Sequence, residues 1–367
     1  MRKNYPIRLT TITPVCIGTG QKLSPYADYI IDEDSKKIFY IDQALVKRKI
    51  AEKLNLIDEY VHGVSTGMDN NRSRFNLYKF LKAKLNIDVY TQHQLQLDCE
   101  AQGNKELCTI IKNAGIYPYI PGSSIKGAIK TALLYDWIVN SKDGRSWLQR
   151  FVSALLQNRD DKEMWTKLEN ELEQALSLFE RLHVTDSTQL NDDDMIVIET
   201  KRIHIGTGEL TIPQVWEAIL EEKQIEFHLG IPYTNLSLVD LIECINRFSQ
   251  DNNQKELMLL NKFGTVFKDK YPEDYTDLVT FYEQINYDIQ QSQNKTAYLR
   301  IGSGKGYYFN SIAVAVANYK EGKYFSAFLI KYGKGYKFKN PHKFPVTRPI
   351  DMSSFKPLGW VKFEVID

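Results

Sequence analysis

Strand-like and helix-like patterns follow one another irregularly along this chain, and this order constrains its fold more than any other feature. A doubly wound parallel sheet needs strands and helices that alternate regularly, so the order favours an α+β fold instead. We expect strands over residues 5–13, 29–31, 37–41, 182–184, 195–202, 224–230, 298–301, 324–330 and 360–366. We expect helices over residues 42–60, 73–85, 123–139, 145–157, 163–181, 213–223, 236–249, 253–268, 274–291 and 310–318.

The length and the cysteines of the chain place it among ordinary globular proteins. At roughly 150 residues per domain, a chain of 367 residues predicts about two domains. Such a chain can bury its cores without disulfide bonds. The four cysteines form no CxxC pair, which indicates a reducing compartment and argues against a zinc ribbon.

Membrane insertion is not expected for this sequence. The longest apolar stretches, such as Ile312 to Ala317, fall far short of the ~18 residues that a membrane span needs. The N-terminus has basic residues but lacks the apolar region and the small-residue cleavage site of a signal peptide. We therefore expect a cytoplasmic protein with no membrane partner.

Charge is balanced over the whole chain but segregated along it. The sequence has 47 Lys and Arg against 46 Asp and Glu, yet residues 295–348 contain eleven bases, one acid and twelve Tyr or Phe. Residues 158–199 contain twelve acids and four bases, which is typical of a solvated helical face. Cations interleaved with aromatic rings can neutralise phosphates and stack on bases, so the basic stretch predicts contact with a nucleic acid.

The segment PGSSIKGAIKTALL, residues 121–134, predicts a helix that begins with an anion site. Ser123 is expected to cap the helix with its hydroxyl, close to the positive end of the helix dipole. Two lysines lie four residues apart on one face. The predicted phosphate site comprises Ser123, Ser124, Lys126 and Lys130. An ordinary capped amphipathic helix is the alternative, and the spacing does not match a P-loop.

A second candidate is a loop with glycines at every second position, Gly302, Gly304 and Gly306. Glycines at this spacing let the backbone approach a ligand closely. Arg300 and Lys305 flank the loop, which suits an RNA backbone, and a plain structural turn is the alternative. The third glycine stands where a Walker A motif needs Ser or Thr, and a dinucleotide fingerprint would need a βαβ context.

Two weaker glycine turns complete the candidate RNA-binding set. Gly18 and Gly20 form a hinge after the first strand, with Lys22 beside them. Gly206-Thr207-Gly208 predicts the tip of a basic hairpin, and Lys201 and Arg202 precede it.

The residues that usually carry catalysis form no recognisable motif. The six histidines include no HxH or HxxxH pair, and no GxSxG is present. Asp192-Asp193-Asp194 is more typical of a solvated acidic turn than of a cation site. His204 is either a surface residue or a general base beside RNA. We therefore expect no catalytic residue, no metal and no cofactor.

Several of these segments together resemble the RAMP superfamily of CRISPR RNA-binding proteins. They are Thr13-Pro14-Val15, the Gly18-Thr19-Gly20 loop, YIPGSSIKGAIKTALL and the late LRIGSGKGYY loop. The ending Pro357-Leu358-Gly359-Trp360-Val361 is similar to that of one subunit of the type III-A Csm interference complex. The resemblance extends from about Ile7 to Val361, although residues 140–290 carry no matching motif.

The resemblance implies two ferredoxin-like, RRM-type domains with helical insertions, which we place at residues 1–200 and 201–367. It also implies a non-catalytic subunit that binds the guide RNA, packs against the backbone subunit and caps the 3′-end side of the guide. The subunit would support guide maturation, in which other nucleases do the trimming. The helix start and the glycine loop then become guide contacts. The aromatic pair of a typical RRM sheet is not recognisable, so base stacking on the sheet has no candidate residue.

Two enzymatic functions remain as alternatives. A metal-independent guide-processing endoribonuclease of the same superfamily would use His204 or His342 with a Tyr or Lys. A backbone-type subunit would cut target RNA with a metal and a loop aspartate, for which Asp28 or Asp32 could be proposed.

Overall fold

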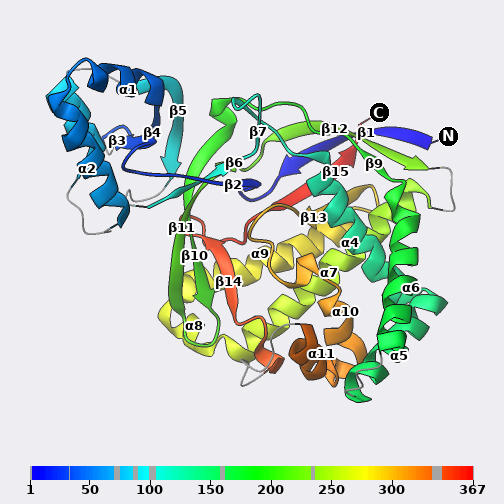
Figure 1. Ribbon diagram of the computed structural model, residues 1–367. Helices are drawn as coiled ribbons and strands as arrows, with labels where there is room; N and C mark the ends of the chain where they lie inside the picture. The colour runs from blue at the N-terminus through cyan, green and yellow to red at the C-terminus, as the bar shows by residue number, and fades with distance from the viewer. Residues whose placement is uncertain are drawn as a thin grey trace.

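The protein is a mixed α+β structure, as the sequence predicts (Figure 1). The computed structural model describes residues 2–32, 34–69, 75–85, 90–98, 105–157, 162–232, 236–332 and 341–366. Two large sheets lie beside a group of packed helices, and a short ribbon pairs β7 (Lys112–Asn113) with β8 (Tyr117–Pro118). No helix in these ranges combines the length and the apolar character that a bilayer span requires.

The first sheet is built around the N-terminal strand. β1 (Arg2–Thr11) pairs antiparallel with β12 (Gln224–Pro232) on one side and with β15 (Trp360–Val365) on the other. β13 (Thr296–Arg300) and β9 (His183–Val184) complete the order β13-β15-β1-β12-β9. The two ends of the chain are therefore neighbours in the middle of one sheet.

The second sheet is longer and follows the order β2-β6-β11-β10-β5-β4-β3. β10 changes partner along its length: its first half pairs with β5, and its second half pairs with β14. The strands are β2 (Gly18–Leu23), β3 (Tyr29–Asp32), β4 (Lys37–Ile41), β5 (Tyr90–Asp98), β6 (Leu107–Ile110), β10 (Met195–His204), β11 (Glu209–Ile219) and β14 (Thr347–Asp351).

Helices cover the first sheet and share one large hydrophobic core with it. α4 (Gly122–Asn140), α7 (Leu238–Phe263) and α9 (Pro272–Gln291) form the layer next to this sheet (Figure 1). α5 (Lys142–Gln157) and α6 (Lys162–Glu180) pack outside α4. The shorter helices are α8 (Thr265–Lys270), α10 (Ala313–Asn318) and α11 (Phe325–Tyr332).

A small lobe projects from this body and has a core of its own (Figure 1). It consists of β3, β4 and the helices α1 (Gln43–Ala51), α2 (Asn55–Asp69) and α3 (Leu77–Phe80), which a π-helical turn extends over Leu81–Leu85. Its buried side chains are Ile30, Ile41, Val46, Ile50, Leu56, Leu77, Phe80, Leu81 and Leu85.

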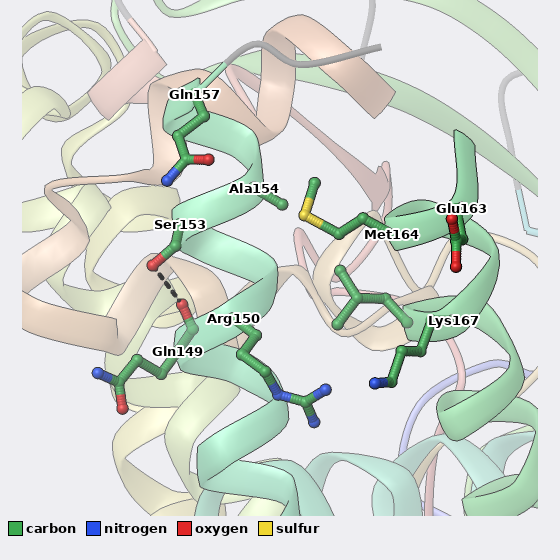
Figure 2. Close-up of a pocket in the computed structure, with 9 residues that line it drawn as sticks. Gln149, Arg150, Ser153, Ala154, Gln157, Glu163, Met164 and Lys167 are labelled. Carbon is green, nitrogen blue, oxygen red and sulfur yellow. Dashed lines mark hydrogen bonds between the residues drawn. The ribbon is translucent and has the colours of Figure 1, made fainter. Parts of the chain in front are cut away.

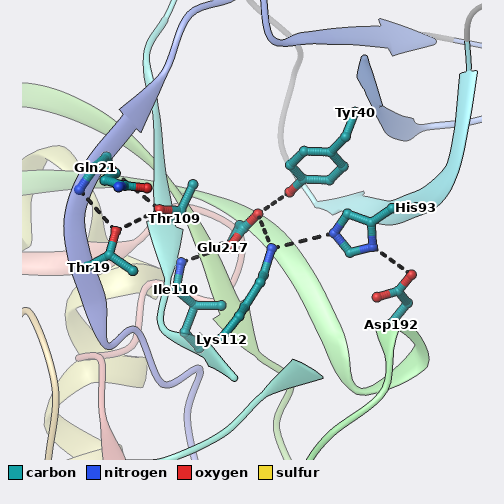
Figure 3. Close-up of polar contacts among 9 residues, drawn as sticks. All are labelled: Thr19, Gln21, Tyr40, His93, Thr109, Ile110, Lys112, Asp192 and Glu217. Atoms are coloured by element: carbon teal, nitrogen blue, oxygen red, sulfur yellow. Dashed lines mark hydrogen bonds and ion pairs between the residues drawn. The ribbon is translucent and has the colours of Figure 1, made fainter. Parts of the chain in front are cut away.

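A buried carboxylate joins the lobe to the body (Figure 3). Glu217 of β11 is fully buried and accepts hydrogen bonds from the Lys112 ammonium at 3.0 Å and from the Ile110 amide at 2.8 Å. The Tyr40 hydroxyl of the lobe donates to the same carboxylate. Burial, together with the charge of Glu217, raises the pKa of Tyr40, so the phenol stays protonated as a donor.

His93 of β5 extends this polar network toward the body. One ring nitrogen, Nδ1, lies 2.8 Å from an Asp192 carboxylate oxygen, and Nε2 lies 3.4 Å from the Lys112 ammonium (Figure 3). The acidic turn that contains Asp192 therefore carries a structural contact, and Asp194 beside it pairs with Lys223 at 2.9 Å.

For two segments the predicted type of secondary structure is wrong. Residues 213–223, expected as a helix, belong largely to β11, because β10 and β6 hydrogen-bond to its two edges. Residues 324–330, expected as a strand, lie in helix α11, whose Phe325, Phe328 and Leu329 are buried at helical spacing. Tertiary pairing overrides local propensity at both places.

Other expectations differ in their boundaries. The helices expected at 236–249 and 253–268 form the single helix α7 followed by α8. Strands β5, β6 and β14 were not expected, whereas the hairpin of β3 and β4 is confirmed. Both large sheets take strands from either side of residue 200, and the division into domains 1–200 and 201–367 stays a prediction.

We predict that removing the ammonium beside Glu217 destabilises the protein strongly. Lys112→Met leaves a buried carboxylate without its cation, which should lower the free energy of unfolding by about 3 kcal/mol. The double variant Lys112→Met/Glu217→Gln should recover part of this loss, because a neutral amide needs no counter-ion. Urea unfolding followed by circular dichroism measures both effects.

The matched control is an exposed ion pair of the same type. Lys22 and Glu106 lie 2.6 Å apart with side chains 52% and 61% exposed. Lys22→Met should therefore change stability by less than about 1 kcal/mol. Equal effects of the two methionine substitutions would show that Glu217 does not depend on its cation.

Candidate nucleic-acid interface

Segments from the two ends of the chain meet at one junction. The glycine loop that follows β13 packs on the segment after β1 and on the segment before β15. The amide of Ser303 donates to the Cys16 carbonyl at 2.6 Å, and the amide of Gly359 donates to the Pro14 carbonyl at 2.9 Å. The motifs around residues 13–20, 300–308 and 357–361, which are separate in the sequence, therefore form one structure.

This junction is so tight that its backbone requires glycine. A Cβ built on Gly302 would lie 2.3 Å from the Cys16 carbonyl oxygen, and the φ angle of Gly302 is +74°. A Cβ on Gly304, where φ is +82°, would lie 2.9 Å from Cδ1 of Leu358. Other residues would meet both a steric clash and an unfavourable backbone conformation here.

Arg300 lies beneath the glycine loop rather than on its outer surface. The residue is 4% exposed, and its guanidinium donates to the carbonyls of Gly304 and Leu358, each at 3.0 Å. The rings of Phe309 and Trp360 lie 5.2 and 5.9 Å from the guanidinium carbon. Burial lowers the pKa of Arg300, although a guanidinium remains charged. In this position Arg300 stabilises the glycine loop by hydrogen bonds from its buried side.

Lys305 is the cation that the loop presents. Its side chain makes no hydrogen bond or ion pair with any residue of the described ranges. Partial burial, and secondarily the charge of Arg300, lower the pKa of Lys305. A half-buried ammonium without a counter-ion gains from an incoming anion, so this loop is suited to a phosphate.

The predicted residues Gly18, Gly20 and Lys22 lie in the edge strand β2 and not in a loop as expected. Among the described strands, β2 pairs only with β6, and its side chains are largely exposed. The hydrogen bond that the Lys22 ammonium donates to the Glu106 carboxylate raises the pKa of Lys22, whose side chain is 52% exposed. Gly302 packs against Cys16 and Ile17, which directly precede β2, so the two glycine motifs are neighbours.

Trp216 of β11 completes this surface, and sequence reasoning missed it. Strand pairing aligns Trp216 with Cys108 of β6 and Cys108 with Lys22 of β2, so the three side chains share one sheet face. Trp216 packs on the hydrophobic cluster that contains Leu358. We call Gly18–Lys22, Trp216 and the loop 302–306 the junction surface.

The beginning of α4 differs from the expectation. The helix starts at Gly122 with Pro121 as its N-cap, so the expected capping role of Ser123 is wrong. The Gly122 amide donates to the Asp186 carboxylate at 2.8 Å. A carboxylate of the chain itself therefore occupies the positive end of this helix. Ser123 is exposed, and Ser124 is half-buried.

Lys126 and Lys130 both reach the end of α6. The Lys126 ammonium donates to the Glu180 carbonyl at 2.8 Å, and the Lys130 ammonium lies 3.8 Å from the Glu180 carboxylate. Glu180 is the last residue of α6, where the helix dipole favours cations. The two lysines thus link α4 to α6, and their contact with RNA stays a prediction.

The expected hairpin around Gly206–Gly208 is confirmed as the turn between β10 and β11. Lys201 of this hairpin lies 3.3 Å from the Glu199 carboxylate, and Arg202 is partly buried. His204 accepts a hydrogen bond at Nδ1 from the Thr207 amide at 3.1 Å, within its own turn. The structure thus brings the start of β2, the strand that carries Gly18, Gly20 and Lys22, next to the 302–306 loop, and it places Lys201 and Arg202 on β10, toward the hairpin turn.

A groove of about 490 Å³ lies between α5 and α6 (Figure 2). Arg150, Glu163 and Lys167 line it, together with the Ser153 hydroxyl, which donates to the Gln149 carbonyl at 2.8 Å. None of the predicted RNA-binding residues lines this groove. Within the described ranges, no three His, Cys, Asp or Glu side chains are grouped so that they could hold a metal ion. Of the basic stretch, Lys334, Lys337 and Lys339 lie outside those ranges.

Comparisons with known proteins identify relatives over almost the whole chain. The sequence profile of the RAMP superfamily matches residues 8–312. The CRISPR system Cms protein Csm5 of Methanocaldococcus jannaschii is 25% identical, and the match covers 98% of this chain and 89% of that protein. Csm5 of Streptococcus thermophilus is 24% identical, with 82% and 78% covered.

Solved structures show the same fold. A chain in the cryo-EM structure of a Csm–crRNA–target RNA ternary complex of a type III-A CRISPR–Cas system superimposes with a TM-score of 0.67. Its sequence is 21% identical, and 99% of this chain and 100% of that chain are covered. The crystal structure of T. onnurineus Csm5 gives a TM-score of 0.58 at 20% identity, with 98% and 100% covered.

We predict that the junction tolerates a side chain at Gly306 better than at Gly302. Both glycines have positive φ angles, +79° and +74°, but a Cβ on Gly306 would meet nothing within 4 Å. Gly306→Ala should cost only the left-handed conformation, about 1 kcal/mol. Gly302→Ala must also displace the Cys16 carbonyl, so its loss of unfolding free energy should be clearly larger. Thermal and urea unfolding measure the two variants, and equal losses would contradict the tight junction.

Proposed function

The chain belongs to the RAMP superfamily, and from this premise we propose that it is a non-catalytic RNA-binding and assembly subunit of a type III-A CRISPR ribonucleoprotein. The two Csm5 relatives and the fold shared with a chain of a Csm–crRNA–target RNA complex support the proposal. The ligand would be the guide RNA, and the neighbours would be the backbone and other subunits of a Csm complex in the cytoplasm.

The finer role follows the family resemblance. The subunit would cap the 3′-end side of the guide, pack against the backbone subunit and support maturation while other nucleases trim the RNA. In this proposal it has no catalytic residue and no cofactor.

Strand order supports one ferredoxin-like unit. In chain order, β1, α4, β9, β12, α7 and β13 follow the βαββαβ arrangement of that fold. Their strands lie in the order β13, β1, β12, β9, with the C-terminal strand β15 inserted between β13 and β1. We propose that the second sheet forms the core of a second such unit.

The junction surface is the observation that carries the RNA-binding proposal. It combines the Lys305 ammonium, which has no counter-ion among the residues that the structure describes, with the half-exposed Lys22. Lysines that neutralise phosphates release condensed counter-ions, so their contribution to binding is largely independent of sequence and falls with salt. Such a surface fits the backbone of a guide whose sequence varies.

The enzymatic alternatives have no specific observation in their favour. The Nδ1 atom of His204 is held by its own turn. The Asp28 carboxylate accepts hydrogen bonds from Gln43 and Ser24, and Asp32 accepts them from Ser35 and Asp34. Each of these candidate carboxylates therefore organises a local turn.

We predict that Lys305 contributes one phosphate contact. In the full-length chain, Lys305→Glu should weaken binding to a single-stranded RNA about tenfold or more at low salt. It should also lower the slope of log affinity against log salt by about one unit. Fluorescence anisotropy over a salt series measures both quantities.

Lys47→Glu is the control, because Lys47 is an exposed lysine on helix α1 of the lobe. It should leave the affinity almost unchanged. Equal effects of the two charge reversals would remove the junction surface from the proposal. Site-specific cleavage of a repeat RNA by the purified protein in the absence of metal would overturn the non-catalytic role.

A further inference from the structure

We propose that Trp216 stacks on an unpaired base of the RNA that the junction surface binds. The inference rests on the proposed RNA-binding function and names a contact that the glycine loop and the lysines do not provide. Base–aromatic stacking is the usual way in which proteins hold single-stranded nucleic acid without reading its sequence. The sheet face lacks the recognisable aromatic pair of an RRM, and Trp216 supplies a ring at a different position.

Trp216 differs from the other four tryptophans of the chain in its contacts. Trp137 and Trp147 lie 6.3 Å apart, Trp165 lies 5.9 Å from the Phe151 ring, and Trp360 lies 5.3 Å from the Phe309 ring. Among the residues that the structure describes, Trp216 pairs with no aromatic ring and no cation. It is also only partly buried.

Glycine at position 18 leaves space beside the six-membered part of this ring. A Cβ on Gly18 would lie 3.0 Å from Cζ3 of Trp216, whereas Gly18 itself is exposed. The φ angle of Gly18 is not in the left-handed region that requires glycine, in contrast to Gly20 and the loop glycines. Glycine at this position therefore keeps this part of the indole ring free of contact with a side chain from position 18.

The junction surface that carries the ring also carries two candidate phosphate ligands, Lys22 and Lys305. Lys22 lies on the same sheet face one strand beyond Cys108, and its ion pair with Glu106 is exposed to solvent. An exposed pair of this kind contributes little, so Lys22 can exchange Glu106 for a phosphate at small cost. Leu358 lies against Gly304, the neighbour of Lys305, and belongs to the cluster on which Trp216 packs, so the glycine loop and the indole share this cluster. The junction surface thus combines an aromatic ring for a base with two lysines for phosphates.

The test compares the full-length wild type with Trp216→Ala and Trp216→Phe. The probes are a single-stranded oligouridine and an abasic oligonucleotide of the same length. Trp216→Ala should weaken oligouridine binding roughly tenfold to a hundredfold, and Trp216→Phe should retain most of the affinity. The abasic probe should bind all three proteins alike, and the salt slope should not change.

A second variant keeps the tryptophan in place. Gly18→Val should cover the ring and weaken oligouridine binding without altering the affinity for the abasic probe. It also preserves the test if Trp216→Ala fails to fold, which a circular dichroism melt would reveal. In the wild type, oligouridine should quench part of the tryptophan fluorescence, and Trp216→Phe should lose this quenching while Trp165→Phe retains it.

Three results would overturn the inference. Trp216→Ala could bind oligouridine like the wild type, it could lose affinity equally for both probes, or it could weaken assembly with partner subunits while RNA binding stays intact. The last result would assign the ring to a protein contact. A wild-type protein that binds neither probe would instead refute the proposed function, so the two failures are distinguishable.

Discussion

The contact between the Cys16 carbonyl and the backbone of Gly302 is the constraint on which the architecture of the candidate interface depends. The Ser303 amide donates to this carbonyl at 2.6 Å, which leaves no room for a side chain on the preceding residue. The contact ties the segment after the first strand to the loop after β13. Because β1 and β15 are also neighbours in the first sheet, both ends of the chain converge where the two sheets meet.

Contacts within the protein then determine which cations remain available to a ligand. Arg300 directs its guanidinium to the carbonyls of Gly304 and Leu358, and Lys126 donates to the Glu180 carbonyl. Both residues stabilise the protein itself in this way. Lys305 has no counter-ion within the described ranges, and Lys22 has only an exposed one. Lysine is therefore engaged in a structural contact at position 126, whereas at position 305 it remains available for the phosphate contact that we propose.

The incorrect prediction of a helix at β11 shows how one wrong element type prevents the recognition of a site. Interpreted as a helix, residues 213–223 place the side chains of Trp216 and Glu217 about 100° apart around the helix axis and not on opposite faces. In the strand, these neighbours point to opposite faces of the sheet. One face receives the indole beside Lys22, and the other receives the buried carboxylate that holds Lys112 and Tyr40. A candidate for stacking and the attachment of the lobe both follow from this alternation.

The sequence by itself determined the mixed α+β class, the hairpin of β3 and β4, the extent of α4 and the positions where the backbone must lack a side chain. These features arise from periodicity and backbone freedom among adjacent residues. Only the tertiary structure decided that β11 is a strand, that Arg300 is buried and that Lys126 is engaged. The pair of Lys112 and Glu217 joins residues 105 positions apart, and no local pattern encodes such a partner. Strand pairing and ion pairing depend on which distant segments meet, which is settled when the whole core forms.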